Sequence, residues 1–213
     1  LLATAGSGTT ASNYNISYTN GGLTINKANA YVIIGSGQSS TYGSTPSINY
    51  TFNTNAAGSG SSISSPAALV GLSGTAVITN APTSSSGAAS YDLTYSTGLT
   101  STNYIYNPAS NSVNFTVNPK PITLTANARS TTYGTALSLG TTAYSITSGG
   151  LNIGETISSV TLKYQGSDTV GDTTNAGTYT SGIVASDATG TGGFNSTNYA
   201  ITYRPANLTV NKK

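Results

Sequence analysis

Hydrophobic and polar residues alternate along several short stretches of this chain. Apolar side chains occupy every second position in residues 113–117, 122–126 and 199–203. A period of two places successive side chains on opposite faces of a strand, so that one face is buried and the other, rich in Thr, meets water. The pattern therefore predicts β-strands, and the helical signal is weak throughout the chain.

One segment occurs three times. Residues 13–27, 103–120 and 198–212 each begin with Asn-Tyr, pass through a stretch rich in turn-forming residues, and end in an alternating strand followed by Asn and Lys. Two strand patterns separated by a short turn are typical of a hairpin. Each copy is therefore predicted to be a β-hairpin that closes a module.

The spacing of the copies indicates the domain organisation. Their closing lysines, Lys27, Lys120 and Lys212, lie 93 and 92 residues apart. That period is the size of a domain, because solenoid repeats are usually about 20–50 residues long. We therefore predict three parts, which are the C-terminal hairpin of a preceding repeat at 1–28 and two β modules at 29–120 and 121–213.

The expected fold class is all-β, with tandem antiparallel β-sandwich modules of the immunoglobulin-like kind. The alternative is a β-grasp-like module with one short helix, for which residues 150–156 are the best candidate. The first hairpin has an apolar face formed by Tyr18, Leu23 and Ile25. We expect residues 14–27 to dock on the next module or on a neighbouring chain.

The predicted joints between modules are very short. They lie at Asn26-Lys27-Ala28 and at Asn118-Pro119-Lys120-Pro121. Proline restricts its own backbone and that of the residue before it, so adjoining modules should keep a narrow range of relative angles. A semi-rigid rod is the expected result.

Composition narrows the function. Only 6% of residues are charged and the net charge is +2, without a basic cluster that would bind nucleic acid or an anionic membrane. The chain contains no Cys and no His, which excludes disulfides and Ser-His-Asp catalysis within these residues. It has no apolar run long enough for membrane insertion. These features favour a secreted bacterial protein that is not an enzyme.

The few acidic residues offer two candidate sites. Asp168, Asp172 and Asn175 could surround a cation such as Ca²⁺, but the bidentate Glu of a calcium loop is missing, so a polar turn is favoured. Glu155 with Asp168 or Asp172 could form a glycosidase pair, but the first module has a single acidic residue, Asp92. We predict no catalytic, cofactor-binding or metal-binding residues and no cofactor.

Lysines and tyrosines give two further candidates. An isopeptide crosslink from Lys27, Lys120 or Lys212 would need a buried lysine beside a carboxylic acid, whereas Asn and Pro around these residues favour solvated lysines. The fifteen tyrosines could form a platform for sugars, and Tyr104 and Tyr106 share one strand face. Core packing is the more usual role of Tyr in a domain without Trp.

Several motifs in a fixed order resemble a known family. They are Tyr42-Gly43 and Tyr133-Gly134 near the module starts, Asn175-Ala176-Gly177-Thr178-Tyr179 in the middle, and the closing Leu-Thr-Val-Asn-Lys. Together they resemble the mostly-β, glycine-rich (MBG) repeats of bacterial filamentous-haemagglutinin-like exoproteins. The first module departs from the pattern with Ser86-Gly87-Ala88-Ala89-Ser90-Tyr91, which leaves the alignment of residues 53–90 open.

The resemblance implies a stalk or adhesive segment of a large secreted or surface-attached protein that supports adhesion, aggregation or biofilm. The expected partners are adjacent repeats of the same chain, with neighbouring identical chains and exopolysaccharide or host glycans as further candidates. Two alternative functions stay open at this point, which are a carbohydrate-binding β module and a subunit of a self-assembling extracellular filament.

Overall fold

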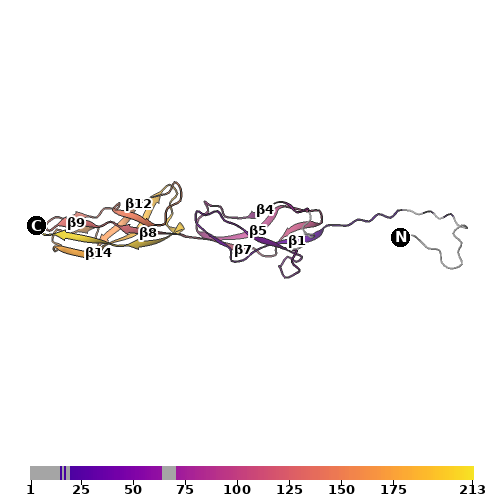
Figure 1. The fold of residues 1–213 in the computed structure, drawn as a ribbon, viewed down its shortest axis with the longest axis horizontal. Helices are drawn as coiled ribbons and strands as arrows, with labels where there is room; N and C mark the ends of the chain where they lie inside the picture. The colour runs from indigo at the N-terminus through magenta and orange to yellow at the C-terminus, as the bar shows by residue number, and fades with distance from the viewer. Residues whose placement is uncertain (1–14, 16, 18–19, 64–70) are drawn as a thin grey trace.

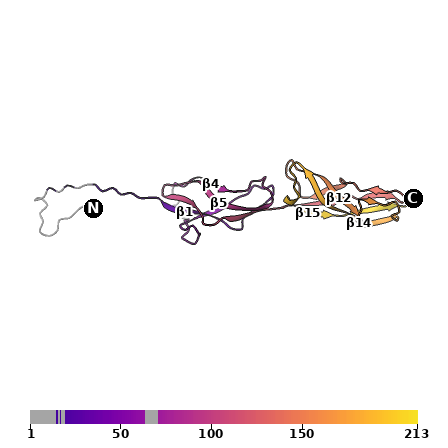
Figure 2. The same ribbon diagram turned by 180° about the vertical axis from the view of Figure 1, so that it is seen from behind.

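The structure is a computed structural model that describes residues 15, 17, 20–63 and 71–213. Figures 1 and 2 show two β-rich bodies placed end to end. Strands β1–β7 pair only with one another, and so do strands β8–β16. We call these two sets the first and the second module, and Pro119 is the residue between them.

The first module contains two sheets. Strand β1 lies between β3 and β6 in the smaller sheet, and the larger sheet has the order β2-β7-β5-β4. The strands are β1 (Ala28–Ile34), β2 (Ser39–Thr41), β3 (Tyr50–Asn53), β4 (Ser73–Thr79), β5 (Ala89–Thr100), β6 (Tyr104–Pro108) and β7 (Val113–Asn118).

The second module has the same topology. Its sheets have the orders β11-β8-β15 and β12-β14-β16-β9, and a short pair, β10-β13, is added. Its elements are β8 (Lys120–Ala126), β9 (Arg129–Thr132), β10 (Leu137–Ser138), β11 (Tyr144–Ser148), β12 (Thr156–Tyr164), β13 (Thr169–Val170), β14 (Gly177–Thr191), the 3₁₀ helix η2 (Ser196–Asn198), β15 (Tyr199–Arg204) and β16 (Ala206–Asn211). The repeat seen in the sequence is therefore a repeat of topology, and we keep 29–120 and 121–213 as proposed boundaries.

The prediction of a closing hairpin is wrong. Strands β15 and β16 are separated by Pro205 alone, yet β15 pairs with β8 in one sheet and β16 pairs with β14 and β9 in the other. Strands β6 and β7 are divided between two sheets in the same way. Both strands of each pair bury their apolar faces in one core from opposite sides, and that arrangement produces the same alternation as a hairpin.

The all-β class is confirmed, but the purely antiparallel immunoglobulin-like arrangement is not. In each module the first strand runs parallel to the Asn-Tyr strand, as in the β1–β6 and β8–β15 pairs. The last strand runs parallel to a short early strand, as in the β2–β7 and β9–β16 pairs. These parallel pairs follow from the crossover, because β6 and β7 run in the same direction in different sheets.

Residues 150–156 do not form the predicted helix. They form a turn in which the Glu155 N–H donates to the Asn152 carbonyl at 3.1 Å, and β12 begins at Thr156. Gly154 has a φ of +88°, which a right-handed helix does not contain. In the described part of the chain the helical element is η2, so the helix of a β-grasp module is absent there. None of the helical structure described is long and apolar enough to cross a membrane.

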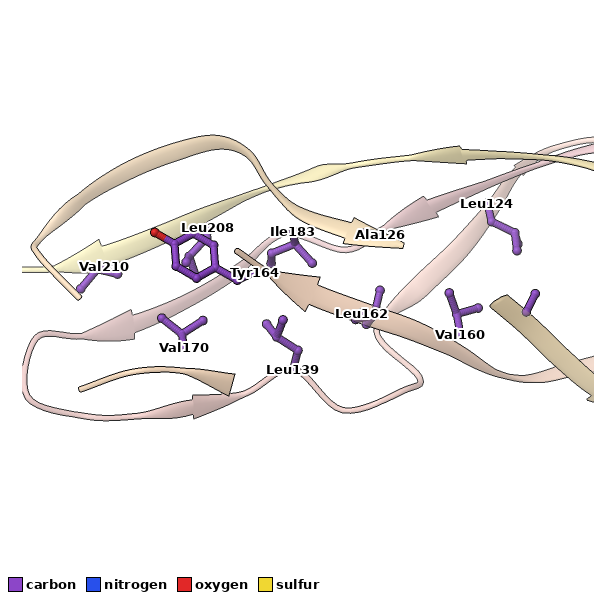
Figure 3. Packing of buried hydrophobic residues seen from close by; sticks show 11 residues of the cluster. Leu124, Ala126, Leu139, Val160, Leu162, Tyr164, Val170, Ile183, Leu208 and Val210 are labelled. Carbon is purple, nitrogen blue, oxygen red and sulfur yellow. The ribbon is translucent and has the colours of Figure 1, made fainter. Parts of the chain in front are cut away.

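Each core lies between the two sheets of its module. In the second module Leu124 comes from one sheet, and Val160, Ile183 and Leu208 come from the other. All four are fully buried in one cluster (Figure 3). The alternation predicted for residues 113–117 and 122–126 is confirmed, since Phe115, Val117, Ile122, Leu124 and Ala126 are all buried.

The predicted docking of the first hairpin on the next module is wrong for the residues that the structure describes. Leu23 and Ile25 are 87% and 85% exposed, and Tyr18 lies outside the described residues. By the repeat, this segment corresponds to β7 and β16, and β7 already occupies that place in the first module. Lys27 Nζ donates a hydrogen bond to the Ser101 carbonyl at 2.7 Å.

The core predicts a stability difference between adjacent positions of one strand. Phe115 is fully buried and Thr116 is exposed. Phe115→Ala should lower the free energy of unfolding by about 3–5 kcal/mol, because it removes buried surface and leaves a cavity. Thr116→Ala should change it by less than about 1 kcal/mol. Urea unfolding of both variants measures the difference, and equal losses would contradict this assignment of the core.

Candidate functional site: the joint between the modules

The two modules are joined through a single residue. Strand β7 ends at Asn118, which pairs with Thr41, and β8 begins at Lys120, which pairs with Tyr199. Because Ala28 pairs in the same way with Tyr104, Lys120 corresponds to Ala28 and not to Lys27. The equivalent joint residues are therefore the asparagines Asn26, Asn118 and Asn211. Lys27 and Lys212 both correspond to Pro119, one residue before the position of Lys120.

The first module contributes Tyr42 to the joint. The Tyr42 N–H donates to the Asn118 carbonyl at 2.9 Å, and the Ser44 N–H donates to the Thr41 carbonyl at 2.9 Å. Gly43 has a φ of +84°, in the left-handed region that favours glycine. This tight turn after β2 projects the tyrosine side chain towards the second module, where it is only 7% exposed.

The second module contributes a carboxylate and a second phenol. Tyr42 Oη donates a hydrogen bond of 2.5 Å to Glu155 Oε1, and Tyr199 Oη donates to Glu155 Oε2. Tyr199 Oη in turn accepts from the Asn152 N–H at 3.0 Å. The Tyr42 and Tyr199 rings meet edge to face with centroids 5.5 Å apart. We call Tyr42, Asn152, Glu155 and Tyr199 the clasp.

Two further polar contacts flank the clasp. The Ala88 N–H of the first module donates to Asn198 Oδ1 at 2.9 Å, and Asn198 is only 9% exposed. Lys120 Nζ donates to Asn152 Oδ1 at 3.0 Å, which fixes the side chain of Asn152 beside Gly43. Both contacts lie next to residues of the clasp and help to keep them in position.

Apolar contacts also cross the joint. One buried cluster combines Ile34, Leu93, Phe115 and Val117 of the first module with Ile122 and Tyr199 of the second. Tyr199 stacks on Phe194, with centroids 5.4 Å apart. The hydrophobic core is therefore continuous from one module into the next, which resists hinge motion at Pro119.

The Glu155 carboxylate and burial both raise the pKa of Tyr42 and of Tyr199. The hydrogen bond to Glu155 is the main cause that raises the pKa of Tyr42, and burial adds to it. For Tyr199, burial is the main cause of its raised pKa, followed by the hydrogen bond to Glu155. Both phenols therefore stay neutral at physiological pH and act as donors to the carboxylate.

Comparison with protein families gives one finding. The family model described as MBG domain (YGX type) matches residues 122–209, which covers nearly all of the second module. This segment is therefore similar to MBG domains. Comparisons with curated proteins and with solved structures gave no match. The resemblance predicted from the motifs is thus confirmed for the second module, and the first module shares the sheet topology of the second.

The acidic residues considered as a catalytic pair lie far apart in the second module. Glu155 precedes β12, and Asp168 and Asp172 follow its far end, so that nine residues of strand place them on the order of 20–30 Å apart. Among the described residues no three His, Cys, Asp or Glu side chains gather into a metal-binding group. Asp172 has a backbone role, because its carbonyl accepts from the Gly134 N–H at 2.9 Å.

The lysines considered for a crosslink differ in their surroundings. Lys120 lies beside both an amide, Asn152, and a carboxylate, Glu155, a combination that sequence reasoning did not detect. The three residues line an open cleft, and Lys120 is half-exposed and not buried as a crosslinking lysine would be. Lys27 donates to a backbone carbonyl.

Tyr104 and Tyr106 do share a strand face, as expected, but that face packs on the core of the first module. Tyr106 contacts Phe52, with centroids 5.1 Å apart. These residues therefore do not form an open platform for sugars. The tyrosines that join the modules are Tyr42 and Tyr199, and their sequence signals were the repeated Tyr-Gly and Asn-Tyr pairs.

Two glycines allow a matched test of the clasp. Gly43 and Gly134 have φ values of +84° and +88°, but an added Cβ at Gly43 would lie 2.2 Å from Asn152 Oδ1, whereas nothing lies within 4 Å at Gly134. Both alanine variants should lose about 1–2 kcal/mol from backbone strain. Gly43→Ala should also displace the Asn152 side chain from the clasp and lose about 1.5–3 kcal/mol with its charge-assisted hydrogen bond from Lys120 Nζ.

Urea unfolding and hydrogen exchange at the Ala88 amide measure the effect of these variants. Exchange at Ala88, whose N–H bonds across the joint, should accelerate in Gly43→Ala and stay unchanged in Gly134→Ala. Equal behaviour of the two variants would show that Gly43 serves only the turn.

The raised tyrosine pKa values predict a loss of joint stability in alkali. The ordinary Tyr pKa is 10.0, and it is raised in the folded state at Tyr42 and Tyr199. Their contribution is therefore fully present below about pH 10 and declines as the pH rises further, because the unfolded chain ionises first. The stability difference between the wild type and Tyr42→Phe should shrink above that pH. A difference that stays constant from neutral pH to pH 11 or so would refute this.

Proposed function

We propose that this chain is a structural stalk segment of a large secreted or surface-attached bacterial adhesin or extracellular fibre. The observation that carries the proposal is the joint, where one residue, a shared carboxylate and a continuous core connect two modules end to end. Domains of the MBG family occur in extracellular proteins. In this role the segment projects a binding region and thereby supports adhesion, aggregation or biofilm.

The path of the chain suits a load-bearing element. In each module the chain enters through the middle strand of one sheet, β1 or β8, and leaves through an inner strand of the other, β7 or β16. These strands run roughly along the long axis in Figure 1. A pull on the two ends therefore shears many hydrogen bonds at once instead of opening them one at a time.

The partners we propose for this role are adjacent repeats of the same chain. Residues 20–27 with their exposed Leu23 and Ile25 favour a second candidate, assembly with neighbouring chains into a filament, because an apolar segment that lies outside the sheets can pair with a sheet edge of another chain. Carbohydrate binding has no comparable support among the described residues. The dispersed carboxylates and the absence of His also support our proposal that the chain is not an enzyme.

The stalk proposal predicts a rod in solution. Small-angle X-ray scattering of the 213-residue chain should give an elongated particle whose length does not change with concentration. A matched variant with a short Gly-Ser insertion between Asn118 and Pro119 should give a broader, more compact distribution, because a Gly-Ser linker is flexible. A glycan array on the same sample should show no binding.

Other outcomes would change the assignment. A wild type as compact as the insertion variant would contradict the rod. Length that grows with concentration would favour the filament, and selective binding of one sugar would favour the carbohydrate-binding module.

A further inference from the structure

The second module repeats the Tyr-Gly turn at the end opposite the joint. The Tyr133 N–H donates to the Asn211 carbonyl at 2.9 Å, and the Thr135 N–H donates to the Thr132 carbonyl at 2.9 Å. Gly134 has a φ of +88°. These are the hydrogen bonds and the backbone conformation found at Tyr42, so the two turns present their tyrosines in the same way.

The two tyrosines differ in what covers them. Tyr42 is 7% exposed because the second module covers it, whereas Tyr133 is 44% exposed. Gly43 lies against Asn152, while nothing lies within 4 Å of a Cβ built at Gly134. The turn at Tyr133 is thus the same element without its partner.

Strand register places the chain end in the right position for such a partner. Asn211 pairs with Thr132 as Asn118 pairs with Thr41. Lys213 therefore occupies the place of Lys120, the first residue of β8. A module whose first strand continued from Lys213 would bring its own Glu155 and Tyr199 equivalents next to Tyr133.

We propose that the surface around Tyr133 and Gly134 is a docking site for the end face of another module that carries the Asn152, Glu155 and Tyr199 arrangement. In this docked state the Tyr133 hydroxyl donates to the half-buried carboxylate of the residue equivalent to Glu155. Gly134 lies against the residue equivalent to Asn152. The inference rests on the proposed stalk role, and it adds which module ends fit together.

The first module lacks one residue that this docking requires. The hydroxyls of Ser73 and Thr100 pair at 2.8 Å, as do those of Thr156 and Thr191 at the start of β12. Ser73 is therefore equivalent to Thr156, and Leu72 in the first module occupies the position of Glu155 in the second. Tyr104 matches Tyr199, but the carboxylate is missing, so the end face of the first module cannot complete the clasp with Tyr133.

A three-module chain tests the proposal. Residues 121–213 are repeated directly after Lys213, with Tyr133→Phe in the added copy so that Tyr133 occurs only once, and nitration by tetranitromethane is measured at Tyr42 and Tyr133 by peptide mass spectrometry. Nitration requires the phenolate, so a buried phenol held by a carboxylate reacts slowly. Tyr133 should react rapidly in the 213-residue chain and become as protected as Tyr42 in the three-module chain.

The control carries Glu155→Leu in the added module alone, which copies Leu72. Tyr133 should regain most of its reactivity there, while Tyr42 stays protected by the unchanged first joint. Glu155→Gln in the added module serves as a second control, with partial protection expected because an amide oxygen can still accept one hydrogen bond.

Three results would overturn the proposal in different ways. If Tyr42 is protected and Tyr133 stays reactive in the three-module chain, docking fails while the stalk role stands. If Tyr42 itself reacts rapidly in the 213-residue chain, the joint is open and the stalk role fails as well. Protection of Tyr133 that rises with the concentration of the 213-residue chain would assign the surface to another copy.

Discussion

The carboxylate of Glu155 accepts hydrogen bonds from two tyrosine hydroxyls that belong to different modules. A half-buried carboxylate is costly unless donors surround it, so the side chains that satisfy it must keep their positions. Tyr42 can reach it only if β2 ends in the Tyr-Gly turn, and Tyr199 only if β15 starts beside β8. The relative orientation of the modules follows from these two requirements.

The crossover between sheets gives the rod its direction. Because the last two strands of each module lie in opposite layers, the chain leaves through a different sheet from the one it entered. The next module can then continue the same line after one residue. A true hairpin would have returned the chain towards the start of the module, and the joint would have needed a longer linker.

Much of this fold could be predicted from the sequence. The strands at 113–117 and 122–126 follow from alternation, and the module period follows from the repeated closing segment. The pairing partner of each strand could not be predicted, because the alternation shows which side chains are buried but not in which sheet the strand lies. The turn at 150–156 was misread because Gly154 and Glu155 are compatible with a helix end as well as with a tight turn.

The structure also resolves the alignment that the sequence left open. Tyr91 and Tyr179 pair with equivalent residues, Phe115 and Leu208, and each donates through its hydroxyl to a carbonyl four residues earlier. The tyrosines therefore align while the glycines near them do not. The clasp was beyond sequence reasoning because it joins residues 113 positions apart. Tyr42 and Tyr199 lie in repeated motifs, but nothing in the sequence connected either of them with Glu155.

The most direct test of a fixed joint is the distance distribution between one spin label in each module, measured by pulsed electron paramagnetic resonance. The chain has no Cys, so Thr51→Cys and Lys163→Cys at exposed strand positions give a single labelled pair. The account predicts one narrow distance peak in the wild-type background and a broad one when Glu155→Leu is added. A broad distribution in both would show that the modules swing freely and that the clasp does not hold them.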